Sequence, residues 1–212
     1  MNLKFETIVN GPFQENCYLV WEEESRAAIF LDPGDEPERL LHTARFQGLD
    51  VRGVYATHGH IDHAGAAAAI CASLGVPFAI HPADGFLLEG MPEQARMFGL
   101  PPIGVPRVDR ELAEGDTVEV GSARGEVICT PGHTPGGVCF RFGDVIFVGD
   151  TLFAGSVGRT DLPGGSTRQL LQSIRERLLV LPDDVRAFSG HGPATSIGYE
   201  KKHNPFLDGR WQ

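Results

Sequence analysis

Short apolar runs bounded by turn residues recur along the whole chain, and between them lie segments whose apolar positions have helical spacing. Such runs predict β-strands, half-buried where apolar and polar residues alternate and fully buried where they are continuous. The strands predicted in this way are Leu3–Val9, Asn16–Trp21, Ala27–Leu31, Val51–Ala56, Pro77–Ile80, Asp116–Val120, Glu126–Thr130, Val138–Phe142, Val145–Val148 and Val185–Phe188.

Helical spacing predicts helices near residues 40–44, over the Ala-rich residues 64–70, and over residues 170–178, where Ser166 begins a capping box. Residues 85–106 contain several Gly and Pro residues that break regular elements, so we expect a loop with one short helix there.

The order of these elements is similar in the two halves of the chain, since strands are followed by helices twice. Asp32 and Asp150 each follow an apolar strand, which hints at pseudo-symmetry. Two mixed sheets packed face to face, with helices on the outside, account for the pattern. We therefore expect residues 1–212 to form a single domain with a four-layer αββα architecture.

Composition narrows the class of protein. The net charge of −10 disfavours nucleic acid as a partner, because phosphate neutralisation needs an excess of Lys and Arg. Residues 1–12 lack the pattern of a signal peptide, and no apolar run is long enough to cross a bilayer. The four cysteines form no CxxC pair and lie in apolar stretches, so we expect buried free thiols and a cytoplasmic enzyme.

The segment Thr57–His63 carries the densest cluster of candidate metal ligands. It lies between a predicted strand and the Ala-rich helix, and it contains His58, His60, Asp62 and His63. In extended backbone His58 and His60 project to the same side, whereas Asp62 and His63 fall on the first helical turn. Imidazole and carboxylate groups favour Zn, Mn or Fe over Ca or Mg.

Three more candidate ligands, His133, Asp150 and His191, lie next to glycines at the ends of predicted strands. Two divalent cations need about this many protein groups, together with a shared water. We expect one cation to be held by His58, His60 and His133, and the other by Asp62, His63 and His191. Asp150 is expected to bridge them. Zinc is favoured, with iron or manganese as the other options.

The other His residues and Asp32 are expected to have structural roles and not to bind metal. We expect Asp32 to orient the ligand loops through hydrogen bonds. His42, His81 and His203 are expected to serve the structure or the surface, and His81 is not expected to be a ligand even though it ends a predicted strand.

The motifs THGHIDHAG, PGHTPGG, GDTLF and SGHGP, at residues 57–65, 131–137, 149–153 and 189–193, resemble those of the metallo-β-lactamase fold superfamily. Within it, residues 149–165 and 190–206 look most like the glyoxalase II group and its short single-domain relatives. The resemblance implies the αββα fold, the two-metal site and hydrolysis of a glutathione thioester such as S-lactoylglutathione.

Two features depart from the glyoxalase II pattern. About twenty residues follow His191, too few for the helical C-terminal domain that helps that group bind glutathione. Arg159 matches the basic residue that meets the substrate carboxylate in the family, but Asp161 replaces the nearby aromatic residue. We expect Arg159 to bind the substrate, against the alternative that it is an ordinary surface charge.

The expected mechanism is metal-assisted. Two cations sharing a water would lower its pKa from 15.7 towards about 7 and so provide a bridging hydroxide. Asp62 is expected both to bind metal and to direct the hydroxide proton. The main alternative is a mononuclear-iron persulfide dioxygenase, which residues 158–161 also resemble. A lactonase, a β-lactamase, a nuclease or a non-catalytic metal module is a weaker interpretation.

Overall fold

The computed structural model describes residues 2–207, which build two six-stranded mixed sheets that face each other. In spatial order, the first sheet contains β1 (Leu3–Asn10), β2 (Glu15–Glu22), β3 (Ala27–Leu31), β4 (Asp50–Tyr55), β5 (Phe78–Ile80) and β6 (Arg110–Glu111). The second contains β14 (Thr195–Ser196), β13 (Arg186–Ser189), β10 (Val145–Gly149), β9 (Val138–Phe142), β8 (Ala123–Cys129) and β7 (Thr117–Val120). A small hairpin pairs β11 (Leu152–Phe153) with β12 (Ser156–Val157).

Strand direction brings several loops to one edge of the two sheets. In the first sheet β3, β4 and β5 run parallel, so the loops that follow their carboxyl ends open at the same edge. In the second sheet β10 and β13 are also parallel. Because ligand-type residues follow β3, β4, β10 and β13, this topology gathers them between the sheets.

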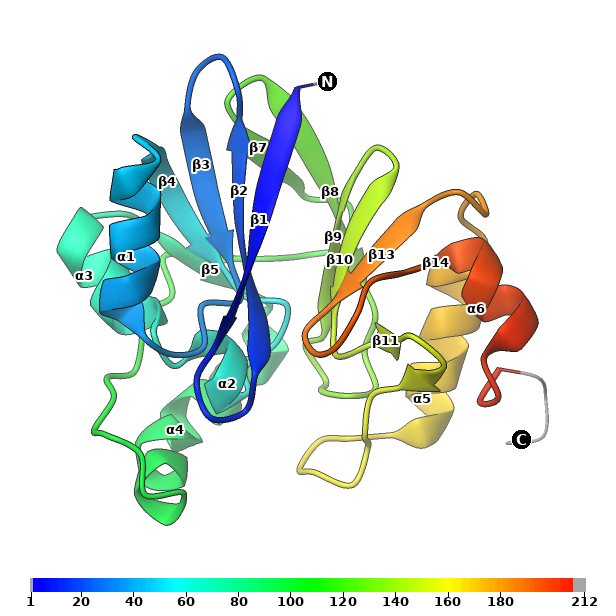
Figure 1. The fold of residues 1–212 in the computed structure, drawn as a ribbon. Helices are drawn as coiled ribbons and strands as arrows, with labels where there is room; N and C mark the ends of the chain where they lie inside the picture. Colours follow the sequence, from blue (N-terminus) through cyan, green and yellow to red (C-terminus); the bar gives the residue numbers. More distant parts are fainter. Residues whose placement is uncertain (1, 208–212) are drawn as a thin grey trace.

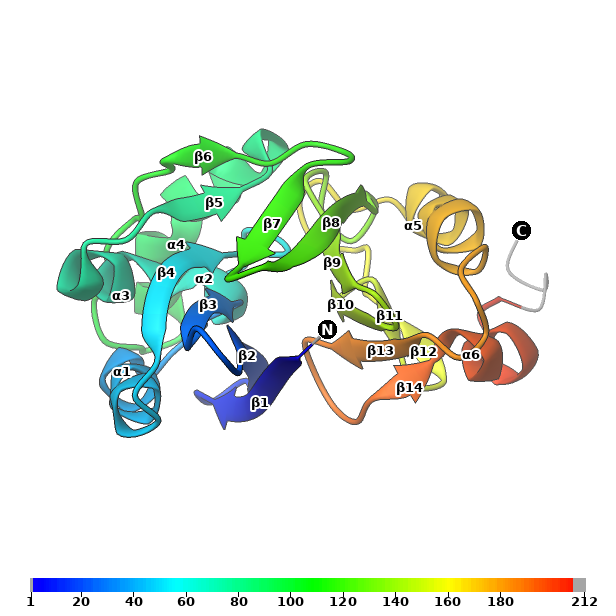
Figure 2. The same cartoon turned by 90° about the horizontal axis from the view of Figure 1, so that it is seen from above.

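Helices cover the outer face of each sheet (Figures 1 and 2). Those on the side of the first sheet are α1 (Pro37–Phe46), α2 (Ile61–Ala64), α3 (Ala67–Leu74) and α4 (Gly85–Met97), with the 3₁₀ turn η1 (Pro82–Asp84). Those on the side of the second sheet are α5 (Thr167–Ser173), its π-helical continuation η2 (Ile174–Leu178) and α6 (Ile197–His203). The predicted αββα architecture is confirmed.

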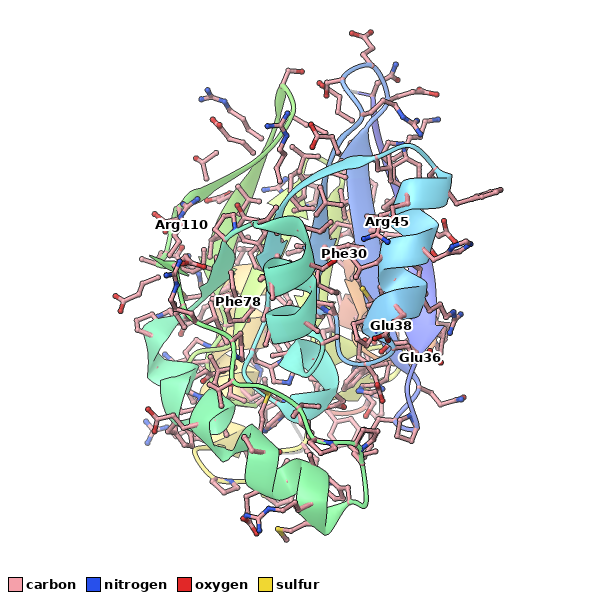
Figure 3. All side chains as sticks on the ribbon, turned by 90° about the vertical axis from the view of Figure 1, so that its left-hand side faces the viewer. Phe30, Glu36, Glu38, Arg45, Phe78 and Arg110 are labelled. Atoms are coloured by element: carbon pink, nitrogen blue, oxygen red, sulfur yellow. The ribbon has the colours of Figure 1, made fainter. Side chains whose placement is uncertain are left out.

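Hydrophobic clusters fill the three spaces between the four layers. Strand β3 shows how alternation divides its side chains: Phe30 packs beneath the helices, whereas Ile29 and Leu31 belong to the core between the sheets. Figure 3 looks onto the helix layer and shows Phe30 and Phe78 lying behind it, while Arg45 of α1 is exposed.

The structure has one helix and a loop over residues 85–106, as predicted, but the helix, α4, is longer than expected and runs over residues 85–97 without a break despite Pro92. Its buried side chains Leu88, Met91 and Ala95 lie at helical spacing and join the core under the first sheet. Burial of that face outweighs the unfavourable helix propensity of Gly and Pro.

The Ala-rich segment also differs from expectation, because it forms two helices rather than one. The amide of Ala66 donates to the carbonyl of Pro33 at 3.0 Å, outside the helical ladder, so α2 ends before α3 begins. Asp62 and His63 therefore lie on a short helix of their own, and its direction is fixed by the turn after β3.

The four cysteines are free thiols, as expected. Cys17 and Cys139 are fully buried, but Cys71 and Cys129 are half-buried, so the expectation of burial was wrong for these two. None of the helices formed by residues 2–207 has the length and apolar character required to cross a bilayer.

Candidate metal centre

The seven residues expected to bind metal come from five separate segments and lie together at the edge between the sheets. His58 and His60 follow β4, and Asp62 and His63 lie on α2. The other three, His133, Asp150 and His191, follow β8, β10 and β13.

Three imidazoles meet at the first group. The Nε2 atoms of His58 and His133 each lie 3.0 Å from Nδ1 of His60. All three side chains are buried, with exposed fractions of 2%, 4% and 8% for His58, His133 and His60. This set matches the expected ligands of one cation.

The second group contains Asp62, His63 and His191. Oδ2 of Asp62 lies 3.3 Å from Nε2 of His191 and 3.9 Å from Nε2 of His63. Asp150 lies between the two groups, because its Oδ1 is 3.4 Å from His63 Nε2 and its Oδ2 is 3.7 Å from both His133 Nε2 and His191 Nε2. A carboxylate in this place has one oxygen available to each group.

Hydrogen bonds outside the cluster determine which ring nitrogens carry protons. Nδ1 of His133 faces the carbonyl oxygen of Arg159 at 2.7 Å, so it must donate, and Nε2 keeps a free lone pair. The Thr57 hydroxyl donates to Asp32, so its oxygen accepts from Nδ1 of His58, and Nε2 of His58 is also unprotonated. These backing contacts prepare both rings for a cation.

The arrangement fits divalent cations. The single proton that Nδ1 of His60 can carry serves only one of the two unprotonated Nε2 atoms beside it. Among the described residues, His63 Nε2 and Asp150 Oδ1 are buried without a hydrogen-bond partner. A buried, unsatisfied polar group costs about 1–3 kcal/mol. Converging lone pairs on imidazole and carboxylate groups are what Zn, Fe or Mn would neutralise.

The local electrostatics favour the ligand-competent ionisation states of His58, His60 and Asp62. Burial lowers the pKa of His60 to about 4 and lowers the pKa of His58 well below its usual value. Burial alone would raise the pKa of Asp62, but the neighbouring His63 and His191 lower it by more, so the net shift is downward. The neighbouring carboxylates raise the pKa of His63, against the effect of its burial, and that of His191, so these two rings give up a proton when a cation binds. Neutral imidazoles and an ionised carboxylate are the forms that bind metal.

Asp32 has the orienting contacts predicted for it. Its carboxylate accepts hydrogen bonds from the backbone amide of Thr57 at 2.6 Å, from the Thr57 hydroxyl at 2.7 Å and from Nδ1 of His63 at 3.1 Å. One side chain thus holds both halves of the Thr57–His63 segment. His81 instead accepts from the amide of Ala83 and belongs to none of the metal-ligand groups found among residues 2–207.

Asp84 has a similar role that the sequence did not reveal. Its buried carboxylate accepts hydrogen bonds from the amide of Gly59 at 2.9 Å, the Thr134 hydroxyl at 2.7 Å and the amide of Gly136 at 2.6 Å. It therefore ties the loop that carries His58 and His60 to the loop that carries His133. Nothing in the spacing around position 84 marks it, because all three partners are distant in the sequence.

Close packing at Gly190 explains why a glycine precedes His191. A Cβ atom at this position would lie 2.4 Å from Oδ1 of Asp150 and 2.4 Å from Cε1 of His63. Only glycine lets the backbone pass this close to both side chains.

Arg159, the predicted substrate-binding residue, has an exposed guanidinium that pairs with the adjacent Asp161. Nε and Nη2 each donate to a separate Asp161 oxygen at 2.7 Å. The ion pair lies beside the metal-ligand cluster, because the carbonyl oxygen of Arg159 holds His133. The substrate role of Arg159 stays a prediction.

Comparison with known proteins identifies the family. Residues 10–191 match the model of the metallo-beta-lactamase superfamily. A Haemophilus influenzae protein named hydroxyacylglutathione hydrolase GloC is 42% identical, with 98% of this chain and 100% of the relative covered. The crystal structure of TTHA1623 in a di-iron-bound form is 43% identical at a TM-score of 0.86, covering 95% of this chain and 100% of that one. The BLEG-1 B3 metallo-beta-lactamase is 36% identical at a TM-score of 0.90, covering 97% and 100%. With the fold and the His/Asp cluster already in place, these matches establish that the chain belongs to the metallo-β-lactamase superfamily of metal-binding hydrolases.

Proposed function

We propose that this protein hydrolyses a glutathione thioester, S-lactoylglutathione or a close analogue, with two divalent cations at the cluster. The observation that carries the proposal is the complete His/Asp set in a chain that is 42% identical, over its whole length, to a relative named hydroxyacylglutathione hydrolase. Zinc is our first choice of metal. The di-iron form of a similar structure supports iron as an alternative.

His58, His60 and His133 would hold one cation, Asp62, His63 and His191 the other, and Asp150 would contribute to both. When bound, such a pair supplies Lewis acidity at the acyl carbonyl and lowers the pKa of water towards about 7.

The side chains of the protein have separate tasks in this reaction. Oδ2 of Asp62 faces Nε2 of His191 at 3.3 Å and the Asp62 side chain is partly exposed, so the carboxylate can accept a hydrogen bond from the attacking water and direct its proton. His133 and His63 are fixed in orientation by the Arg159 carbonyl and by Asp32. The leaving thiolate, with a pKa of roughly 8.5, departs without a general acid.

Asp84 and Asp32 act through the residues they hold. Both are buried carboxylates that accept hydrogen bonds from backbone amides of the ligand loops. Keeping ligands within a fraction of an ångström of their working positions is the usual contribution of such outer contacts. A cytoplasmic location is part of the proposal and is supported by the four free thiols.

The rival function is persulfide dioxygenation at a single iron, which residues 158–161 also suggest by resemblance. A non-catalytic metal module would be expected to have lost a ligand, whereas all seven positions carry competent groups. The B3 metallo-beta-lactamase neighbour makes β-lactam hydrolysis a further activity to measure.

One experiment separates these possibilities. Protein loaded with zinc, iron or manganese is assayed for S-lactoylglutathione hydrolysis, for oxygen consumption with glutathione persulfide and for β-lactam cleavage, alongside elemental analysis. The proposal requires two metals per chain and thioester hydrolysis as the fastest activity. One iron per chain with oxygen uptake would reject it in favour of the dioxygenase.

A further inference from the structure

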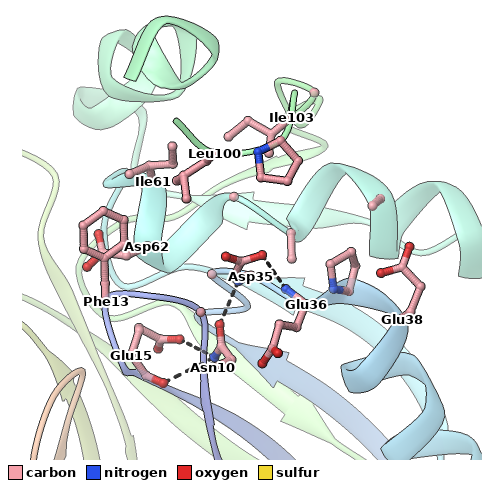
Figure 4. A pocket seen from close by; sticks show the side chains of 18 of the residues that line it. Asn10, Phe13, Glu15, Asp35, Glu36, Glu38, Ile61, Asp62, Leu100 and Ile103 are labelled. Atoms are coloured by element: carbon pink, nitrogen blue, oxygen red, sulfur yellow. Dashed lines mark hydrogen bonds between the residues drawn. The ribbon is translucent and has the colours of Figure 1, made fainter. Parts of the chain in front are cut away.

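A cavity of about 350 Å³ adjoins the metal-ligand cluster on the side of Asp62. It lies between the loop that joins β1 to β2, the start of α1, helices α2 and α3, and residues 100–104. Figure 4 shows Asp62 and Phe13 at one end and Glu38 at the other. The cavity is therefore continuous with the carboxylate that we place in the reaction.

One wall of this cavity is apolar. Ile61 and Ala66 form its buried part, and the half-buried Leu100 and Ile103 complete it from the segment after α4. Figure 4 shows Ile61, Leu100 and Ile103 on the same side of the cavity. Ala69 of α3 also lines it, and its exposed methyl group leaves the space above the helix open. This wall suits a hydrocarbon chain.

The other wall is acidic and already hydrogen-bonded. Nδ2 of Asn10 donates to Oε2 of Glu15 at 2.8 Å, and its Oδ1 accepts from the amide of Asp35 at 2.8 Å. Glu36 and Glu38 extend the acidic side towards the far end. None of the residues that line the cavity, all of which the structure describes, is a Lys, Arg or His. Glu36 is paired with Arg39, which lies outside the lining, at 2.7 Å. Asp35 and Glu38 still place negative charge along this side, so the carboxylate end of a chain is disfavoured beside them.

The two sides of the cluster thus differ in charge. The cation Arg159 belongs to the side of His133, where its carbonyl oxygen holds that ring. The cavity belongs to the side of Asp62 and carries carboxylates only among its charged groups. Glutathione has two carboxylates, so the thiol half of a glutathione thioester fits the side of Arg159 better than the cavity.

We propose that this cavity is the acyl pocket: it binds the acyl chain of the thioester, favours uncharged apolar chains longer than lactoyl, and excludes chains that end in a carboxylate. The inference rests on the proposed thioesterase function and specifies its substrate class. Burying one methylene contributes about 0.8 kcal/mol, or roughly fourfold in binding. The volume is at the lower end of pockets for small ligands, so a medium-length chain fits.

The first test compares thioesters of glutathione on the metal-loaded protein. We expect kcat/KM for hexanoylglutathione to exceed that for acetylglutathione by about tenfold, since part of the added chain is buried. Succinylglutathione should be poorer than the equally long butyrylglutathione by about tenfold or more. Equal rates across the series would overturn the acyl pocket while leaving the thioesterase function intact. Hydrolysis of none of these thioesters would overturn both.

The second test fills the pocket. Ala69→Phe places a ring in the cavity, and Ala72→Phe puts the same ring on an exposed position of the same helix that does not line it. Ala69→Phe should reduce the hexanoyl-to-acetyl ratio of kcat/KM to near one, whereas Ala72→Phe should keep the wild-type ratio.

Calorimetry with S-hexylglutathione and S-methylglutathione provides a readout that does not depend on turnover. The preference for the hexyl compound, measured as the ratio of the two Kd values, should disappear only in Ala69→Phe. An unchanged preference in Ala69→Phe would overturn the proposal.

Discussion

The carboxylate of Asp84 accepts a hydrogen bond from the backbone amide of Gly59 at 2.9 Å, between the two histidines of the first ligand group. The same carboxylate accepts hydrogen bonds from the Thr134 hydroxyl and the Gly136 amide, which follow His133 in the same loop. Burial raises the pKa of Asp84, because a carboxylate loses its hydration when it is buried. The three hydrogen bonds that hold the two ligand loops together offset this cost. That relationship leads to the first prediction.

Asp84→Ala should weaken metal binding by about 10–100-fold, as expected when outer contacts of a metal site are lost. It should also lower the free energy of unfolding by about 3 kcal/mol, because two backbone amides and a hydroxyl lose their acceptor. Metal titration and urea unfolding measure the two effects. Asp109→Ala is the control, since Asp109 accepts a hydrogen bond from the amide of Phe78, belongs to none of the metal-ligand groups among the described residues and should change stability only. Wild-type metal affinity in Asp84→Ala would show that the loops need no such tie.

Removal of the metals should destabilise the protein as well as stop hydrolysis. Ligand binding to the native state alone adds about 4 kcal/mol at a thousandfold excess over Kd, so Tm should fall by about 10 °C after chelation. Differential scanning calorimetry before and after chelator treatment checks this, and addition of zinc or iron should restore both Tm and activity. A chelated, metal-free sample with undiminished turnover would contradict the two-metal proposal.

His60→Ala and Asp62→Ala should each reduce kcat/KM for a glutathione thioester by about a thousandfold or more, because each removes a ligand and Asp62 also takes part in proton transfer. His81→Ala is the matched control and should keep wild-type activity, since His81 lies outside the ligand groups. Circular dichroism and steady-state kinetics on the three variants separate loss of the site from loss of the fold. Full activity in either ligand variant would refute the mechanism.

The parts of this fold that the sequence predicts are those with a local signal. The apolar runs of the central strands and the cluster of His58, His60, Asp62 and His63 are read directly from neighbouring residues. Gly190 could be identified because a glycine beside a ligand residue is itself a short-range pattern.

The parts that escaped prediction depend on contacts between distant residues. Helix α4 extends over Gly90 and Pro92 because one face is buried against the core. The short strand β6 exists only because β5 lies beside it. Asp84 has no signal of its own, since its partners at positions 59, 134 and 136 become neighbours only after folding.

Arg159 provides the last prediction, because its charge is divided between Asp161 and any substrate carboxylate. The hydrogen bonds from Arg159 lower the pKa of Asp161 to about 2, so the pair is intact at neutral pH. Arg159→Ala should raise KM for a glutathione thioester severalfold with kcat nearly unchanged, since an exposed ion pair contributes up to about 1 kcal/mol. Asp161→Asn should lower KM, because the guanidinium then loses its competitor. Arg168→Ala, at a nearby exposed position, is the control for general charge. If KM is the same in Arg159→Ala and the control, Arg159 is a surface charge and glutathione is bound by other groups.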